Sequence, residues 1–201
     1  MALLAAAIGL APAVRATTKG LNQIVTPDIQ PAGVLSISGQ VQDARIGNPA
    51  EVQLELGLTR RAEVAFFQGL RPGEEIFGAE FNLWQQGPHL LTAGAVNWSS
   101  RGGGADPVLE YGRYAGRDHL IAGAIRADRR VEGILGWSHQ LSDSLLFAVD
   151  YQSGPGNAVT VGLTVNLAPN LQMNPAVYFA NTRPHRAMAY VVLSWNLTVW
   201  R

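Results

Sequence analysis

Residues 159–167 read VTVGLTVNL, and this stretch decides the fold. Valine and leucine occupy every odd position, and threonine, glycine and asparagine occupy the even ones. A period of two is typical of a β-strand, because successive side chains point to opposite faces of the sheet. The stretch therefore predicts a strand with one apolar face and one face of small or polar residues.

The same alternation recurs from Gly33 onward, with turn residues between the segments. Clear examples are residues 52–58, 77–83, 144–152 and 191–199. Weaker examples are residues 33–41, 61–69, 89–100, 107–116, 119–127, 130–141 and 171–181. The segments predict about twelve strands of roughly 9–12 residues, long enough to cross a bilayer at a tilt of about 45°. We therefore expect residues 33–201 to form an all-β, transmembrane, antiparallel up-and-down β-barrel.

The composition supports a membrane barrel. Charged residues make up 15% and apolar residues 47% of the chain, whereas a soluble domain has roughly 25% charged residues. A soluble β-sandwich is the alternative, but it would need polar outer faces, and the polar face here is mostly small and uncharged. The 15 basic and 15 acidic residues balance, which argues against a nucleic-acid partner. The chain has no cysteine, which excludes disulfides and thiolate chemistry.

The predicted connections between strands fall into two classes. Every second connection is short, namely residues 59–60, 86–88, 116–118, 142–143 and 168–170. Those between them are mostly longer or richer in glycine and charge. Short turns at one end and longer loops at the other are the arrangement of outer-membrane barrels.

Three of the short turns share a sequence pattern. Residues 56–64, 140–146 and 166–172 each contain an apolar residue, a small or hydroxyl residue and two turn residues, after which the next predicted strand begins. The pattern resembles the periplasmic hairpins of bacterial outer-membrane β-barrel proteins. The resemblance covers most of the predicted barrel and implies an architecture without one particular activity. One departure is that Trp200 is followed by Arg201, whereas such proteins usually end on an aromatic residue.

The N-terminal part reads as a targeting signal and a linker. Ala2–Leu10 is a short apolar stretch, and residues 14–16 offer small side chains for a signal peptidase. No basic residue precedes the apolar stretch, so an ordinary N-terminal helix is the alternative. We expect residues 1–16 to be a cleaved signal peptide, and the chain to be exported to the outer membrane of a Gram-negative cell. Residues 17–32 lack a clear period and are predicted to form a periplasmic strap or plug.

If the apolar faces meet lipid, the polar faces line the lumen. The predicted lumen-lining residues are Glu55, Glu80, Asn82, Glu110, Arg126, Glu132 and Asp150. Acids outnumber bases in this set, which would attract cations. A three-residue turn at residues 128–130 would place Arg126 opposite Glu132 as a salt bridge. The alternative is a packed polar core in which the acids are hydrogen-bonded or neutralised.

Three functions are left open. About twelve strands fall between the eight of a filled barrel and the sixteen of an aqueous channel. The leading hypothesis is porin-like transport through a narrow channel for small solutes or ions. The alternative is a closed structural barrel that serves as a platform for a partner or for envelope assembly. A third possibility is an outer-membrane lipid-modifying enzyme.

The histidines argue against catalysis. The expected register places His119 opposite His139, with Ser138 and Ser142 on the other face, so no Ser–His pair forms. Two histidines without a carboxylate partner make a weak metal site. We therefore predict that the chain is not an enzyme and has no catalytic, cofactor or metal site. The expected partners are the lipid bilayer and the transported solutes or ions; the sequence does not determine an oligomeric state.

Overall fold

The computed structural model describes residues 20–71, 73–102, 104–127 and 129–200. The predicted signal peptide at residues 1–16 lies outside these residues. In the part of the chain that is described, no helix has the length and apolarity that a membrane span requires.

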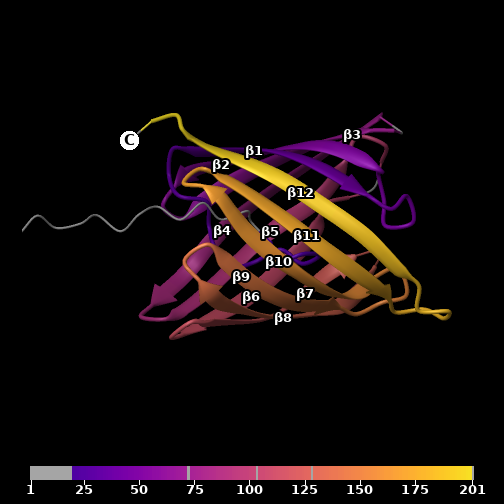
Figure 1. Ribbon diagram of the computed structural model, residues 1–201. Helices are drawn as coiled ribbons and strands as arrows, with labels where there is room; N and C mark the ends of the chain where they lie inside the picture. Colours follow the sequence, from indigo (N-terminus) through magenta and orange to yellow (C-terminus); the bar gives the residue numbers. More distant parts are fainter. Residues whose placement is uncertain (1–19, 72, 103, 128, 201) are drawn as a thin grey trace, which may run out of the picture.

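The described residues form twelve antiparallel strands that close into a barrel (Figure 1). Each strand pairs with its neighbours in the chain, and β1 pairs with β12. The strands are β1 (Val34–Gln42), β2 (Ala50–Thr59), β3 (Ala62–Leu70), β4 (Gly73–Gln86), β5 (His89–Ser99), β6 (Asp106–Ala115), β7 (Asp118–Ala127), β8 (Arg130–Ser142), β9 (Leu145–Gln152), β10 (Ala158–Ala168), β11 (Leu171–Ala180) and β12 (Ala187–Thr198). The predicted fold class and strand number are confirmed.

The alternation along each strand separates an apolar exterior from a polar interior. In β12, Leu193 and Trp195 are 47% and 48% exposed, whereas Ser194 between them is 0% exposed. Large apolar side chains are exposed in the same way on every strand except β9, whose outward residues are partly exposed. A continuous apolar exterior on a closed barrel is the surface that faces lipid in a membrane.

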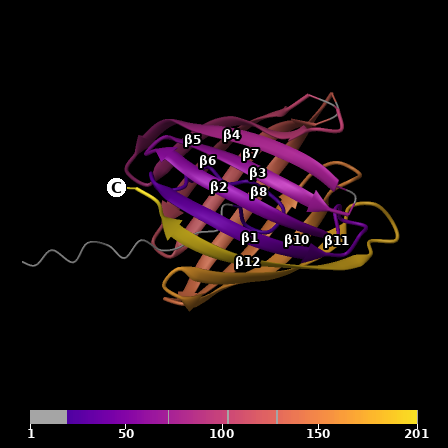
Figure 2. The same ribbon diagram turned by 90° about the horizontal axis from the view of Figure 1, so that it is seen from above.

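The two ends of the barrel differ in their connections (Figures 1 and 2). At one end, which we call the short-turn end, every strand-to-strand connection is two residues long. At the other, the long-loop end, the longest connections are residues 43–49, 100–105, 153–157 and 181–186. β1 begins and β12 ends at the short-turn end. The predicted division into short turns and longer loops is therefore confirmed.

The β7–β8 hairpin corrects one part of the predicted register. Its turn contains two residues instead of the expected three. Arg126 therefore pairs with Val131, and Glu132 pairs with Ile125. Glu132 and Ile125 are buried inside, whereas Arg126 is exposed on the outer face. The predictions that Arg126 lines the lumen and forms a salt bridge with Glu132 are wrong, because a shift of one residue moves a side chain to the opposite face.

The same shift changes the partners of two histidines. His119 pairs with Ser138, and His139 pairs with Asp118. The predicted pair of His119 and His139 is therefore wrong. His119 and Ser138 share the inner face, whereas His139 lies on the outer face, where its Nδ1 is 2.9 Å from Asp118 Oδ1.

Candidate channel lumen and the segment inside it

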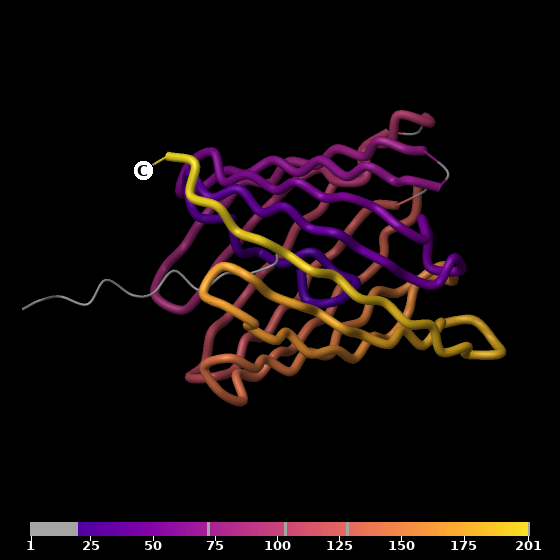
Figure 3. Tube along the Cα trace, turned by 45° about the horizontal axis from the view of Figure 1, so that its top comes forward, coloured from indigo at the N-terminus to yellow at the C-terminus, as the bar shows by residue number. Residues whose placement is uncertain are grey.

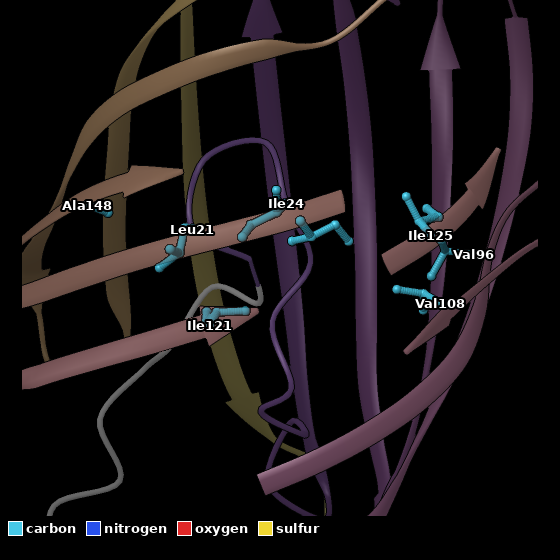
Figure 4. Packing of buried hydrophobic residues seen from close by; sticks show 8 residues of the cluster. Leu21, Ile24, Val96, Val108, Ile121, Ile125 and Ala148 are labelled. Atoms are coloured by element: carbon cyan, nitrogen blue, oxygen red, sulfur yellow. The ribbon is translucent and has the colours of Figure 1, made fainter. Parts of the chain in front are cut away.

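The described residues before β1 lie inside the barrel, where Figure 3 shows them as a coiled indigo trace. We call residues 20–32 the inserted segment. At its tip, the amide of Leu21 donates to the carbonyl of Ile24 over 3.2 Å, which makes a tight turn. The side chains of Leu21 and Ile24 are buried among apolar residues of the barrel wall (Figure 4). Those wall residues are Val96, Val108, Ile121, Ile125, Ile134 and Ala148.

This packing fills the β5–β9 side of the interior with a hydrophobic core. The side chains of Val96, Ile125 and Ile134 point inward, and each is buried in this cluster. Burying apolar side chains in this way stabilises the position of the inserted segment by roughly 1.5–3 kcal/mol for each large side chain. The tip of the inserted segment and the five strands β5–β9 therefore form one packed unit.

Asp150 of β9 anchors the tip of the inserted segment. Its carboxylate is 1% exposed and accepts hydrogen bonds from the backbone amides of Asn22, over 2.8 Å, and Gln23, over 3.3 Å. The hydroxyl of Thr160 also donates to this carboxylate. On the other side, the hydroxyl of Tyr178 donates to the carbonyl of Asn22 over 2.9 Å. The predicted lumen residue Asp150 thus faces inward, and its partners belong to the inserted segment and the wall.

Two further contacts hold residues 27–30 of the inserted segment, which lie between its tip and β1. The backbone amide of Gln30 donates to the Glu63 carboxylate over 2.6 Å. The hydroxyl of Thr92 donates to the carbonyl of Pro27 over 2.6 Å. Buried backbone amides are costly to leave without an acceptor, so Glu63 and Asp150 are the principal polar anchors.

Glycines in the wall make room for the inserted segment. Gly57, Gly112, Gly136 and Gly162 occupy inward positions of β2, β6, β8 and β10, and a Cβ at each would meet an atom of the segment at less than van der Waals distance. At Gly57 that Cβ would overlap the carbonyl oxygens of Gln30 and Pro31. Gly39, which faces outward, has no atom within 4 Å of the same position. The shape of the wall therefore matches the segment.

The other predicted lumen residues are also buried in the interior. Those are Glu55, Glu80, Asn82, Glu110 and Glu132. They do not form one cluster. Glu55 and Glu80 line the same cavity, whereas Glu132 lies at the long-loop end and accepts hydrogen bonds from the amides of Gln152, over 2.8 Å, and Asn157, over 2.7 Å. Asn82 donates to Thr92 over 3.4 Å.

A cavity of about 270 Å³ lies beside the inserted segment, and Leu21, Ile24 and Val96 of the hydrophobic core form part of its lining. Four glutamates of β2, β3 and β4 line it, namely Glu51, Glu55, Glu63 and Glu80. The sequence analysis did not select Glu51 and Glu63. In residues 61–69 both faces carry apolar side chains, so the alternation that would have placed Glu63 is weak.

A second cavity of about 610 Å³ opens at the long-loop end, and we call it the vestibule. The smaller cavity and the vestibule share Gln23, Asn97 and Tyr178 as lining residues. The two spaces therefore adjoin at the tip of the inserted segment. Together they lead from the long-loop end into the interior.

A closed barrel of twelve antiparallel strands, with an apolar exterior and a polar interior, is the architecture of porin-type outer-membrane proteins. Solved structures share this fold. The KdgM porin in complex with disordered oligogalacturonate is 10% identical, with a TM-score of 0.60 over 81% of this chain and 98% of that chain. The NanC porin in a rhombohedral crystal form is 9% identical, with a TM-score of 0.53 over 80% of this chain and 97% of that chain. No protein-family model matches the chain, and no curated protein matches it in sequence.

Proposed function

We propose that this protein is a narrow channel for small solutes or ions in the outer membrane. The observation that carries the proposal is the path formed by the vestibule and the adjoining cavity inside a barrel with an apolar exterior. The shared fold with the KdgM and NanC porins supports a transport role. The short-turn end would face the periplasm, as in other outer-membrane barrels, after export of the chain.

The charge of the cavity wall favours cations. Glu51 and Glu55 of β2 and Glu80 of β4 lie around the same narrow space. A wall of one sign in a medium of low dielectric constant raises the local concentration of the opposite charge. We therefore expect the channel to prefer cations over anions.

The inserted segment limits the width of the path. The hydrophobic core fills the β5–β9 side, and the cavity beside it is lined by the inserted segment and by residues of β1–β5, β11 and β12. In this proposal residues 20–32 act as a plug, and the conductance of the channel is small because of it.

The test is the conductance of the refolded protein in a planar bilayer under a salt gradient. We expect discrete current steps with a cation-selective reversal potential, which Glu51→Gln and Glu80→Gln move toward zero. The matched control is Glu75→Gln, because Glu75 is exposed on the same strand as Glu80. A reversal potential that all three variants change equally would contradict selection by the cavity wall.

One observation favours a second function, a closed structural barrel. The inserted segment is held by a hydrophobic core and by two carboxylates, which would suit a permanently filled interior. A bilayer that stays silent with folded protein would support this function, and partners of the long loops would then be sought.

We also propose that the barrel is not an enzyme, although His119 and Ser138 share the inner face. The ring of His119 stacks on Tyr114 of β6, with centroids 4.0 Å apart and planes 7° apart. Its Nε2 approaches the site where a Cβ of Gly112 would lie, also on β6. The imidazole thus leans away from Ser138, which a general base must approach to accept its proton.

A further inference from the structure

The vestibule at the long-loop end has a basic lining. Arg45, Arg183 and Arg186 line it, and none of the described residues that line it carries a carboxylate. The cavity behind it is lined by four glutamates. The sign of the lining charge therefore reverses along the path, at the tip of the inserted segment.

The three arginines are not equivalent. Arg45 Nε donates to Asp43 over 2.8 Å, and these hydrogen bonds lower the pKa of Asp43 to about 2. The positive charge of Arg45 is therefore shared with an acid of its own loop. For Arg183 and Arg186, the described residues include no carboxylate within ion-pair distance. These two guanidinium groups carry the unshared positive charge of the vestibule.

The loop that carries these arginines is held in place by hydrogen bonds. The side-chain amide of Asn181 donates to the carbonyls of Gln152 and Gly154, over 2.8 Å in each case. The backbone amide of Asn181 donates to the carbonyl of Asn157 over 2.8 Å. Asn181 thus fixes the start of the loop to residues 152–157, and the amide of Ala180 donates to the carbonyl of Arg186 over 3.3 Å across its base, which lowers the cost of ordering the loop around a ligand.

The floor of the vestibule is the tip of the inserted segment. The side-chain amide of Gln23 donates to Asn157 over 3.0 Å and accepts from the backbone amide of Ala158 over 3.1 Å. Next to these polar groups, Tyr178, Pro184 and Met188 give apolar surface. Guanidinium groups, amides and apolar faces together suit a solute that carries a carboxylate or phosphate on a partly apolar body.

We propose that the vestibule is an anion-binding site, in which Arg183 and Arg186 hold a carboxylate or phosphate group above Gln23. The glutamates of the cavity behind the site repel an anion, so the ligand stays at the mouth. It then covers the entrance to the path that cations would take. The site lies in the outer part of the proposed path, and anion binding can be measured whether or not the barrel conducts.

The primary experiment is a titration of the refolded barrel in detergent with inorganic phosphate, followed by phosphorus NMR. We expect saturable binding, weakened roughly three- to fivefold by Arg183→Gln or by Arg186→Gln and more in the double variant. The matched control is Arg117→Gln, because Arg117 is exposed at the short-turn end. Phosphate binding that the double variant leaves unchanged would overturn the proposal, and so would equal weakening by Arg117→Gln.

Two further measurements define the source of the anion and the side of the site. In nanodiscs that contain lipid A, loss of phosphate binding would assign the vestibule to a lipid phosphate, whereas retention would assign it to a dissolved solute. Both outcomes support the site, provided that the double variant binds phosphate more weakly than the unchanged protein in the same detergent. If the barrel conducts, phosphate should reduce the current only from the long-loop side, and an equal reduction from both sides would contradict the placement.

Discussion

The substitution Gly57→Ala tests whether the wall glycines hold the inserted segment in place. An added Cβ would lie 2.7 Å from the carbonyl carbon of Pro31 and would overlap the carbonyl oxygens of Gln30 and Pro31. Because these are backbone atoms, no side-chain rotation relieves the contact. Overpacking of this kind costs about 1–3 kcal/mol.

That cost changes the population of the displaced segment. Since 1.4 kcal/mol corresponds to about a tenfold change in an equilibrium constant, the displaced fraction should rise roughly 5- to 150-fold. Gly57 lies in a strand and is absent from the residues with positive φ, so alanine adds little backbone strain of its own. The matched control is Gly39→Ala, which also lies in a strand and adds a Cβ with no atom within 4 Å.

The assay uses the absence of cysteine from the chain. A single Ile24→Cys reporter would lie at a position that is 2% exposed at the tip of the segment. We expect a water-soluble thiol reagent to label it at least about five times faster in the Gly57→Ala background than in the Gly39→Ala background. Equal labelling rates in the two backgrounds, in protein confirmed as folded, would refute the reasoning.

Three further predictions concern other parts of the barrel. Asp150→Asn replaces a carboxyl oxygen that accepts from two backbone amides, and we expect faster hydrogen exchange at Asn22 and Gln23, equivalent to about 1–3 kcal/mol of lost protection, with Asp143→Asn as the control. Arg126→Gln should leave the reversal potential unchanged, because Arg126 faces outward; a shift as large as that of Glu51→Gln would contradict the register. The pKa of Asp43 is lowered by Arg45, so their pair stabilises the β1–β2 loop above the ordinary carboxyl pKa of about 4, and this stabilisation is lost as the pH falls toward about 2. Proteolysis of residues 43–46 should therefore increase over that range, and Asp43→Asn should remove the pH dependence.

The strands of the barrel could be predicted because one face of each meets lipid. In β10, and in β12 from Leu193 onward, the exterior is apolar and the interior carries small or polar side chains, so the alternation is complete. The same rule weakens where an inward residue packs against the inserted segment. Val96 and Ile134 are apolar although they face inward, and a strand with apolar side chains on both faces gives no clear period.

The register of the β7–β8 hairpin could not be predicted because its turn lacks the usual signal. Arg129 has a φ of 65°, a conformation that two-residue hairpin turns usually give to glycine or asparagine. With arginine at this position, a turn of three residues was an equally acceptable interpretation. That single residue decided the placement of Arg126 and of both histidines on β7 and β8.

The position of the inserted segment depends on inward residues of the strands whose role the sequence alone does not reveal. Gly57 and Gly162 occupy inward strand positions where a larger side chain would improve the wall of an empty barrel. Apolar residues and glycines at inward positions together indicate that a segment of the chain fills part of the interior. The sequence of residues 20–32 alone has no period that would reveal the match.

The seam between β1 and β12 has a consequence for the order of assembly. Val34 pairs with Thr198, so the barrel closes only when the two ends of the sheet meet. The inserted segment precedes β1, yet its anchors Thr92 and Asp150 come from strands far along the chain. Joining residues so distant in sequence is slow, because the entropy of closing the long loop is lost before the contacts form. If the inserted segment binds before β1 pairs with β12, the barrel closes around it. If it is still outside when the barrel closes, it must enter the interior through one end of the closed barrel. An intermediate without β12 should therefore already protect Leu21 and Ile24 from solvent.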